Sequence, residues 1–169
     1  MNRDYYIDED FIRIIDYIAT HKEFQKTKDI THHGITRYDH CMRVAYYSYK
    51  VTKFLKLDYK KTAEAALLHD FFLDEVDSEN GIAKLRHHPD CAVSNSLKYF
   101  DLDNKQIDII KTHMFPVTFT PPKYLESWIV DIVDDLSAIY ERCYITRYQL
   151  KSATTFLLIL LLKNLLVFF

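Results

Sequence analysis

At 169 residues, the chain is long enough to bury one hydrophobic core. Hydrophobic residues make up 49% of it and only two glycines and four prolines interrupt it, which favours helices joined by short connections over a turn-rich β architecture. The charges of the 22 basic and 24 acidic residues nearly cancel, so the net charge gives no indication of a nucleic-acid polymer as a partner. We therefore expect a single all-α domain over residues 1–169.

Cysteine usage favours a reducing compartment. The three cysteines, Cys41, Cys91 and Cys143, are odd in number and widely spaced, and no signal-peptide pattern opens the chain. We therefore expect the protein in the cytoplasm, where thiols stay reduced.

Two helices are expected in the first third of the chain. The first carries apolar side chains at helical spacing, namely Phe11, Ile14, Ile15 and Ile18. Gly34 then interrupts the chain, and Thr36 can cap a second helix that runs to about Leu55. The spacing predicts that His40, near the start of this helix, lies on a buried stripe with Val44, Tyr47, Val51 and Leu55.

An apolar segment that ends in His69 and Asp70 closes a third helix, which Asp58 or Tyr59 opens. A buried carboxylate is costly unless a salt bridge, a hydrogen-bond network or a metal ion compensates for it. Adjacent helical residues point about 100° apart. His69 and Asp70 can therefore converge on one ion between helices while making poor partners for each other.

Two further histidines are expected beside helix ends. His88 stands directly before Pro89, an order typical of a helix that starts with proline at its first position. Asp103 is expected to cap the next helix, in which His113 lies on the apolar side. The prolines within residues 114–122 predict an aromatic loop that is not helical.

A long helix is expected from about Lys123. It carries Asp131, Asp134 and Asp135, and the periodicity does not choose among them, so all three could be solvated acids. The buried stripe that the spacing predicts comprises Ile129, Ile132, Val133, Leu136, Ile139 and Tyr140.

Taken singly, each of these histidines and aspartates has a structural explanation as a satisfied core residue or a surface residue. Imidazole and carboxylate side chains from facing helices are, however, the way in which helical bundles build metal sites. The joint pattern therefore favours a metal site, with candidate ligands His40, His69, Asp70, His88, His113 and at least one of the late aspartates.

The order of these residues resembles that of the HD superfamily of metal-dependent phosphohydrolases. The stretch His40-Cys41-Met42-Arg43-Val44 is similar to that family's first-ligand stretch, and Leu67-Leu68-His69-Asp70 is similar to its HD signature. The stretches around His88 and His113 resemble the extra histidines of the subgroup that holds two metals, and Asp134 with Ala138 fits the last ligand. The resemblance covers most of Thr36 to Glu141. It implies an HD-type helical bundle whose metal-site core spans about 36–141.

The resemblance also implies the chemistry. Two divalent transition-metal ions would be bound, one by His40, His69, Asp70 and Asp134 and the other by Asp70, His88 and His113, with Asp70 as the bridge. Catalysis would depend above all on His69 and Asp70, and Fe, Mn, Co, Ni and Zn all suit such a ligand set. A metal-activated hydroxide would attack phosphorus in a nucleotide or another small phosphate ester. Two alternatives stay open: a mixed-valent di-iron oxygenase of the same fold, and a regulatory HD domain that binds metal without catalysis.

One position departs from the family pattern. Several two-metal HD phosphodiesterases carry a phosphate-binding lysine three residues after the HD pair, where this chain has Leu73. We expect other side chains to hold the phosphate, with His33 and Arg37 preferred because they flank Gly34 just before the His40 helix. The further candidates, each of which could instead be solvated or ion-paired at the surface, are Arg43, Lys84, Arg86 and Lys111.

The carboxyl-terminal segment reads as an extra apolar helix over about 147–169. Lys163 and Asn164 interrupt its apolar run, and from Ala153 onward it would extend about 25 Å, less than the ~30 Å of a hydrocarbon core. A simple membrane span is thus disfavoured. The alternatives are a helix docked on its own domain, a helix buried in a homodimer, and membrane association at the bilayer surface.

Overall fold

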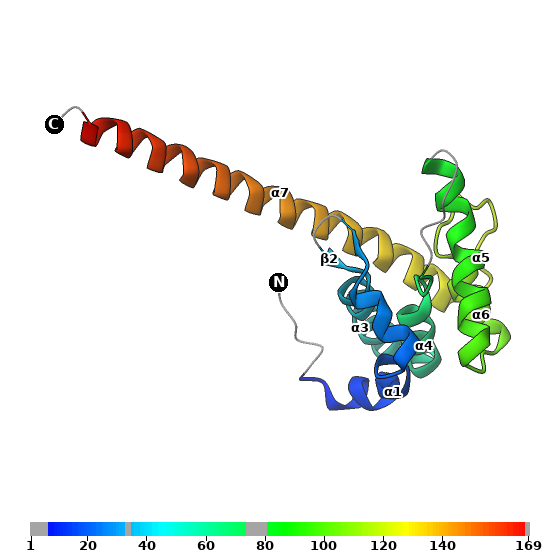
Figure 1. The fold of residues 1–169 in the computed structure, drawn as a ribbon. Helices are drawn as coiled ribbons and strands as arrows, with labels where there is room; N and C mark the ends of the chain where they lie inside the picture. Colours follow the sequence, from blue (N-terminus) through cyan, green and yellow to red (C-terminus); the bar gives the residue numbers. More distant parts are fainter. Residues whose placement is uncertain (1–6, 33–34, 74–80, 168–169) are drawn as a thin grey trace.

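The computed structural model describes residues 7–32, 35–73 and 81–167, and the fold is all-α as the composition predicts (Figure 1). Strand pairing within the described residues is confined to two short strands, β1 and β2, that place Thr31 opposite Thr36. The elements in chain order are α1 (Glu9–Ala19), α2 (Lys22–Gln25), η2 (Lys26–Lys28), β1 (Thr31–His32), β2 (Ile35–Thr36), α3 (Arg37–Phe54), α4 (Tyr59–Leu68), α5 (Gly81–Tyr99), α6 (Asn104–Thr112) and α7 (Leu125–Val167).

The hydrophobic core forms around α3 and α4. α3 packs against α4 and α7, and α4 also packs against α1 and α6 (Figure 1). The stripe predicted for the first helix is confirmed in part, because Phe11, Ile15 and Ile18 are fully buried while Ile14 is partly buried against the core. This arrangement brings the carboxyl ends of α4 and α6 to the flank of α7.

Side-chain caps fix where three helices begin, as the sequence predicts. Thr36 Oγ1 accepts a hydrogen bond from the backbone N–H of Asp39 at 3.0 Å at the start of α3, and Asp58 caps α4. Asp103 and Gln106 form a reciprocal capping box at the start of α6. These caps set the register of the helices that carry His40, His69 and His113.

The buried face of α3 differs from the predicted stripe. Val44 is buried, but Tyr47, Val51 and Leu55 are 48%, 38% and 47% exposed. Ser48 and Thr52 occupy the interior instead, and Thr52 Oγ1 donates to the Ser48 carbonyl oxygen at 2.7 Å. Because the Thr52 hydroxyl is satisfied within its own helix, it can be buried at little cost, and apolar spacing alone picked the wrong face.

The prediction that a helix starts at His88 and Pro89 is wrong. α5 begins at Gly81 and continues through Pro89 to Tyr99. A proline inside a helix removes one backbone hydrogen bond. The burial of Pro89 and of Ala92 one turn later anchors the helix on the domain, which offsets that loss.

The last two predicted helices are one continuous helix, α7, whose second half projects away from the domain (Figure 1). Its predicted stripe is confirmed in part, because Ile129 is buried and Val133 packs against the core, but Ile132, Leu136 and Ile139 are 53%, 60% and 60% exposed. Asp131 and Asp134 are buried on the domain side instead. Asp131 and Asp134 face inward because polar groups of the domain form hydrogen bonds or ion pairs with their carboxylates. Over the residues that the structure describes, none of the helices combines the length and the apolar composition that a membrane span requires.

Candidate metal centre

The six residues singled out as metal ligands lie together, although they come from five separate helices or helix ends. His40 lies in the first turn of α3, His69 caps the end of α4 with Asp70 directly after it, and His113 caps the end of α6. The remaining two, His88 and Asp134, project from the middle of α5 and from α7. Sequence positions up to 94 residues apart thus share one buried site.

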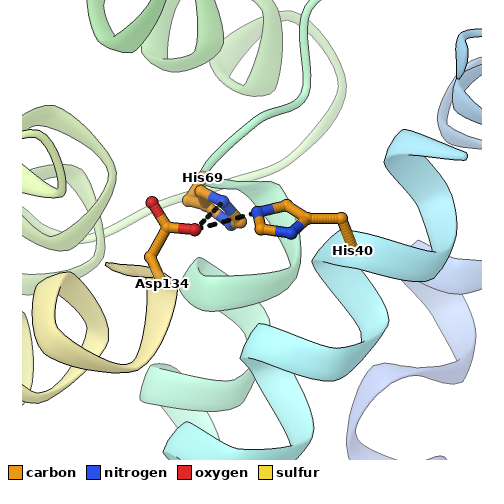
Figure 2. A group of neighbouring side chains, drawn as sticks. All are labelled: His40, His69 and Asp134. Atoms are coloured by element: carbon orange, nitrogen blue, oxygen red, sulfur yellow. Dashed lines mark hydrogen bonds and ion pairs between the residues drawn. The ribbon is translucent and has the colours of Figure 1, made fainter. Parts of the chain in front are cut away.

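His40, His69 and Asp134 form the first candidate group (Figure 2). Asp134 Oδ1 lies 2.8 Å from His40 Nε2 and 3.5 Å from His69 Nε2. The three side chains come from three helices and point toward one another, so one ion could be held between them (Figure 2).

His69, Asp70 and His113 form the second candidate group, and His88 adjoins it. Asp70 Oδ1 lies 3.4 Å from His88 Nε2 and 3.7 Å from His113 Nε2. The other oxygen, Oδ2, lies 4.0 Å from His69 Nε2. The two oxygens of Asp70 therefore face different groups of histidines.

Backbone carbonyls fix the tautomers of two of the histidines. His69 Nδ1 donates to the Ala66 carbonyl oxygen and His113 Nδ1 donates to the Ile110 carbonyl oxygen, each at 2.7 Å. Because a carbonyl oxygen can only accept, the proton of each neutral ring stays on Nδ1 and the lone pair of Nε2 points into the site. Both rings are thereby prepared to bind a cation.

The charges in the centre shift the pKa values of its members. Despite burial, which opposes ionisation, the surrounding imidazoles lower the pKa of Asp70 to about 2 and hold the pKa of Asp134 well below its usual range. Burial and the neighbouring imidazoles of His69 and His88 lower the pKa of His113 to about 3. At neutral pH both carboxyls are therefore ionised and His113 is neutral, the protonation states in which these side chains bind metal.

Two buried atoms support a metal ion as the missing partner. Asp70 Oδ1 and His69 Nε2 are buried without any hydrogen bond, and a buried polar atom in that state is costly. His88 Nε2 and His113 Nε2 lie 2.9 Å apart. Two nitrogens bound at adjacent positions of one ion lie about 3 Å apart, since each metal–nitrogen bond is about 2.1 Å long. The residues present thus fit a metal centre.

Glu141 is a member of this site that the sequence reasoning missed. Its carboxylate lies 3.1 Å and 3.2 Å from His40 Nδ1 and also pairs with Arg43. A carboxylate on Nδ1 holds a proton there and fixes the ring so that Nε2 of His40 faces Asp134. Glu141 follows Asp134 by two helical turns in α7, so their shared helix face is the one signal that the sequence offered.

The predicted phosphate-binding residues are distributed around the centre. The guanidinium of Arg37 lies 3.7 Å above the Phe72 ring and donates to the Phe72 carbonyl oxygen. Arg43 is buried, and its guanidinium pairs with Glu141, the carboxylate that orients His40. Lys111 is exposed and lies 3.4 Å from Asp90, and His33 lies outside the described residues.

Arg37 lies near the centre through its contact with Phe72. Phe72, on which it stacks, has its ring 5.5 Å from the ring of His88. Among the other candidates, Arg86 donates to the Val117 carbonyl oxygen at 3.1 Å, and the side chain of Lys84 lies outside the described part of the structure.

Comparison with known families agrees with this geometry. Residues 37–139, more than half of the chain, match the sequence model of the HD domain family. The chain belongs to the HD domain family. Such domains bind divalent metals and are commonly hydrolytic, and this one has His/Asp groups that could hold them. No curated protein and no solved structure matches the chain.

Proposed function

We propose that this HD domain is a metal-dependent phosphohydrolase with two ions, acting on a nucleotide or another small phosphate ester. The observation that carries the proposal is the placement of Asp70, whose two oxygens face different histidine groups. His40, His69, Asp70 and Asp134 would hold one ion, and Asp70, His88 and His113 would hold the second. When bound, the ions would lower the pKa of water and neutralise charge on phosphoryl oxygens.

The protein's own groups prepare that chemistry. The Ala66 and Ile110 carbonyls and the Glu141 carboxylate orient three imidazoles, so little rearrangement is needed when an ion enters. His69 and His113 are almost completely buried, which keeps bulk water away from their side of the site and strengthens its electrostatic interactions. No side chain is needed as a nucleophile.

Substrate binding is proposed on the side where Arg37 and Phe72 lie. A hollow of about 490 Å³ adjoins Phe72, and its lining includes Leu73, His87, Lys98 and Tyr99. This volume suits a small organic ligand. Arg37, beside Phe72, supplies a cation for the phosphate in place of the lysine that Leu73 replaces.

Metal reconstitution with a substrate screen tests the proposal. The purified chain is loaded separately with Mn, Co, Ni, Fe and Zn, its metal content is measured, and each form is assayed for phosphate release from nucleoside mono- and triphosphates and for opening of cyclic phosphates. We expect about two ions per chain and turnover that Asp134→Asn abolishes, with Asp135→Asn, an exposed neighbour, as the matched control.

Each contrary result identifies an alternative. Oxygen consumption by the iron form with an EPR signal, but without phosphate release, would indicate the oxygenase. Metal-dependent melting without turnover on any substrate would indicate a regulatory domain. A chain that retains less than about one ion would overturn the metal centre itself.

A further inference from the structure

The face of α7 opposite the metal centre carries a continuous apolar seam. Asp134 and Glu141, which are two turns apart, face the domain. On the other side Ile129 is buried, but most of the described apolar residues are half-exposed or more, although each is large enough to be buried in a core. The seam comprises Leu125 (56% exposed), Ile132 (53%), Leu136 (60%), Ile139 (60%) and Leu150 (61%), together with the exposed Cys143 and Thr146.

The spacing of the seam is that of a coiled coil. From Ile132 onward the seam residues follow one another at alternating intervals of four and three, and this order is kept to Leu150 without a break. Such a repeat keeps one narrow apolar line on the same side of a helix and is suited to a second helix with the same repeat. Cys143, Thr146 and Leu150 also line a shallow groove along α7 beyond the domain. The half of α7 that projects from the domain (Figure 1) thus carries side chains suited to packing against a second helix.

We propose that this seam is a homodimer interface in which α7 packs antiparallel against α7 of a second copy. In this register Leu136 of each copy packs on Ile139 of the other, Ile132 packs on Cys143, and Leu125 packs on Leu150. The contact is isologous, so both copies use the same surface and the assembly closes at two.

Charge selects the antiparallel direction. Asp135 and Arg142 are exposed, flank the seam on the same side and lie two turns apart. In the antiparallel pair each Asp135 meets Arg142 of the other copy, which gives two opposite-charge contacts about the twofold axis. In a parallel pair Arg142 would instead face Arg147 of the other copy, and these like charges would repel.

The size of the seam agrees with a stable dimer. From Leu125 to Leu150 the helix is about 39 Å long at ~1.5 Å per residue. Covering its half-exposed apolar side chains together with the flanking Trp128 and Tyr140, which are 38% and 49% exposed, would remove roughly 800 Å² per copy from water, the size of a standard protein interface.

The mass of the full chain in solution is the first test. Sedimentation equilibrium should give twice the 20.2 kDa of one chain at micromolar concentration. The double variant Leu136→Asp with Ile139→Asp should be monomeric, with unchanged helical content and metal content because both side chains point away from the centre. Leu97→Asp, at a half-exposed leucine on α5 (48%), should remain dimeric.

Charge exchange and crosslinking test the direction. Asp135→Arg and Arg142→Asp should each weaken the dimer about fivefold to tenfold, and the two changes together should restore it. In a Cys91→Ser background, Ile132→Cys should form a disulfide with Cys143 of the other copy, whereas Cys143 alone should not crosslink with itself. A monomeric wild-type chain, a dimer that survives Leu136→Asp with Ile139→Asp, or a Cys143–Cys143 disulfide would overturn the proposal. So would a chain that stays monomeric and sediments with anionic lipid vesicles.

Discussion

Replacement of Asp70 by asparagine should remove both metal ions at once. The substitution keeps the size of the side chain but removes its charge and turns one oxygen into an amide nitrogen, which cannot bind a cation. Since Oδ1 lies 3.4 Å from His88 and 3.7 Å from His113 and Oδ2 faces His69, both proposed ions lose a ligand. His113→Ala removes a ligand from the second group only and should leave about one ion per chain.

The magnitude follows from binding linkage. An ion present at 1,000 times its Kd stabilises the folded state by about 4 kcal/mol. For a chain of this length each kcal/mol raises Tm by about 2–4 °C, so each bound ion should raise Tm by about 8–16 °C, and the wild-type chain with two ions should melt about 16–32 °C higher with metal than with a chelator. Asp70→Asn should show almost none of this difference, and elemental analysis of the same samples should find little bound metal.

The control for this experiment is Asp135→Asn, which removes an exposed acid next to Asp134. It should keep the full metal content and the full melting shift. If Asp70→Asn retains about one ion and half or more of the melting shift, Asp70 does not join the two groups and the two-ion arrangement is refuted.

Three further outcomes are expected. In a calorimetric titration Glu141→Gln should lower the affinity for the first ion about 10–100-fold and leave the affinity for the second ion unchanged. Glu126→Gln, at a buried acid of α7 that pairs with Lys105, should change neither affinity. Burial and nearby Asp135 raise the pKa of Asp131 from 3.8 to about 7, so the metal-free chain should lose stability as pH rises through this window because the folded state holds the proton longer. The free energy of unfolding, measured with urea at pH 5 and pH 8, should fall by on the order of 1 kcal/mol less in Asp131→Asn than in the wild-type chain. An equal fall in both chains would refute the raised pKa of Asp131. Arg37→Ala should raise KM for the phosphate ester several-fold with metal content unchanged, whereas an unchanged KM would exclude Arg37 from substrate binding.

The placement of His40, His69, Asp70 and His113 could be predicted because it depends on a short local order. His69 and Asp70 end an apolar helix, and Thr36 and Asp103 mark the starts of the helices that carry His40 and His113. Periodicity did not choose Asp134 among the three late aspartates, and only the resemblance to the HD family singled it out. Glu141 has no such signal, because its role arises only when α7 crosses α3 and brings it beside His40.

The helix faces could not be predicted from periodicity alone. In α7 the spacing correctly identified an apolar stripe, but it could not say whether the domain or another surface covers that stripe. The domain takes the opposite face because His40 and His69 offer partners for Asp134, and Ser127 donates to Asp108 at 2.8 Å. Polar side chains that have such specific partners can therefore be buried in preference to apolar side chains on the opposite face of the helix.

The proposed centre can attract phosphate without the lysine that Leu73 replaces. Asp70 and Asp134 are the two carboxylates within the ligand set, and the charge of Glu141 is offset by Arg43. Two divalent ions bound there would carry more positive charge than these two carboxylates cancel, in a site largely closed to water on one side. An anionic ester is drawn to such a centre even though the chain as a whole carries a net charge of -2. Leucine in place of lysine at position 73 should therefore affect which ester binds more than whether a phosphate binds at all.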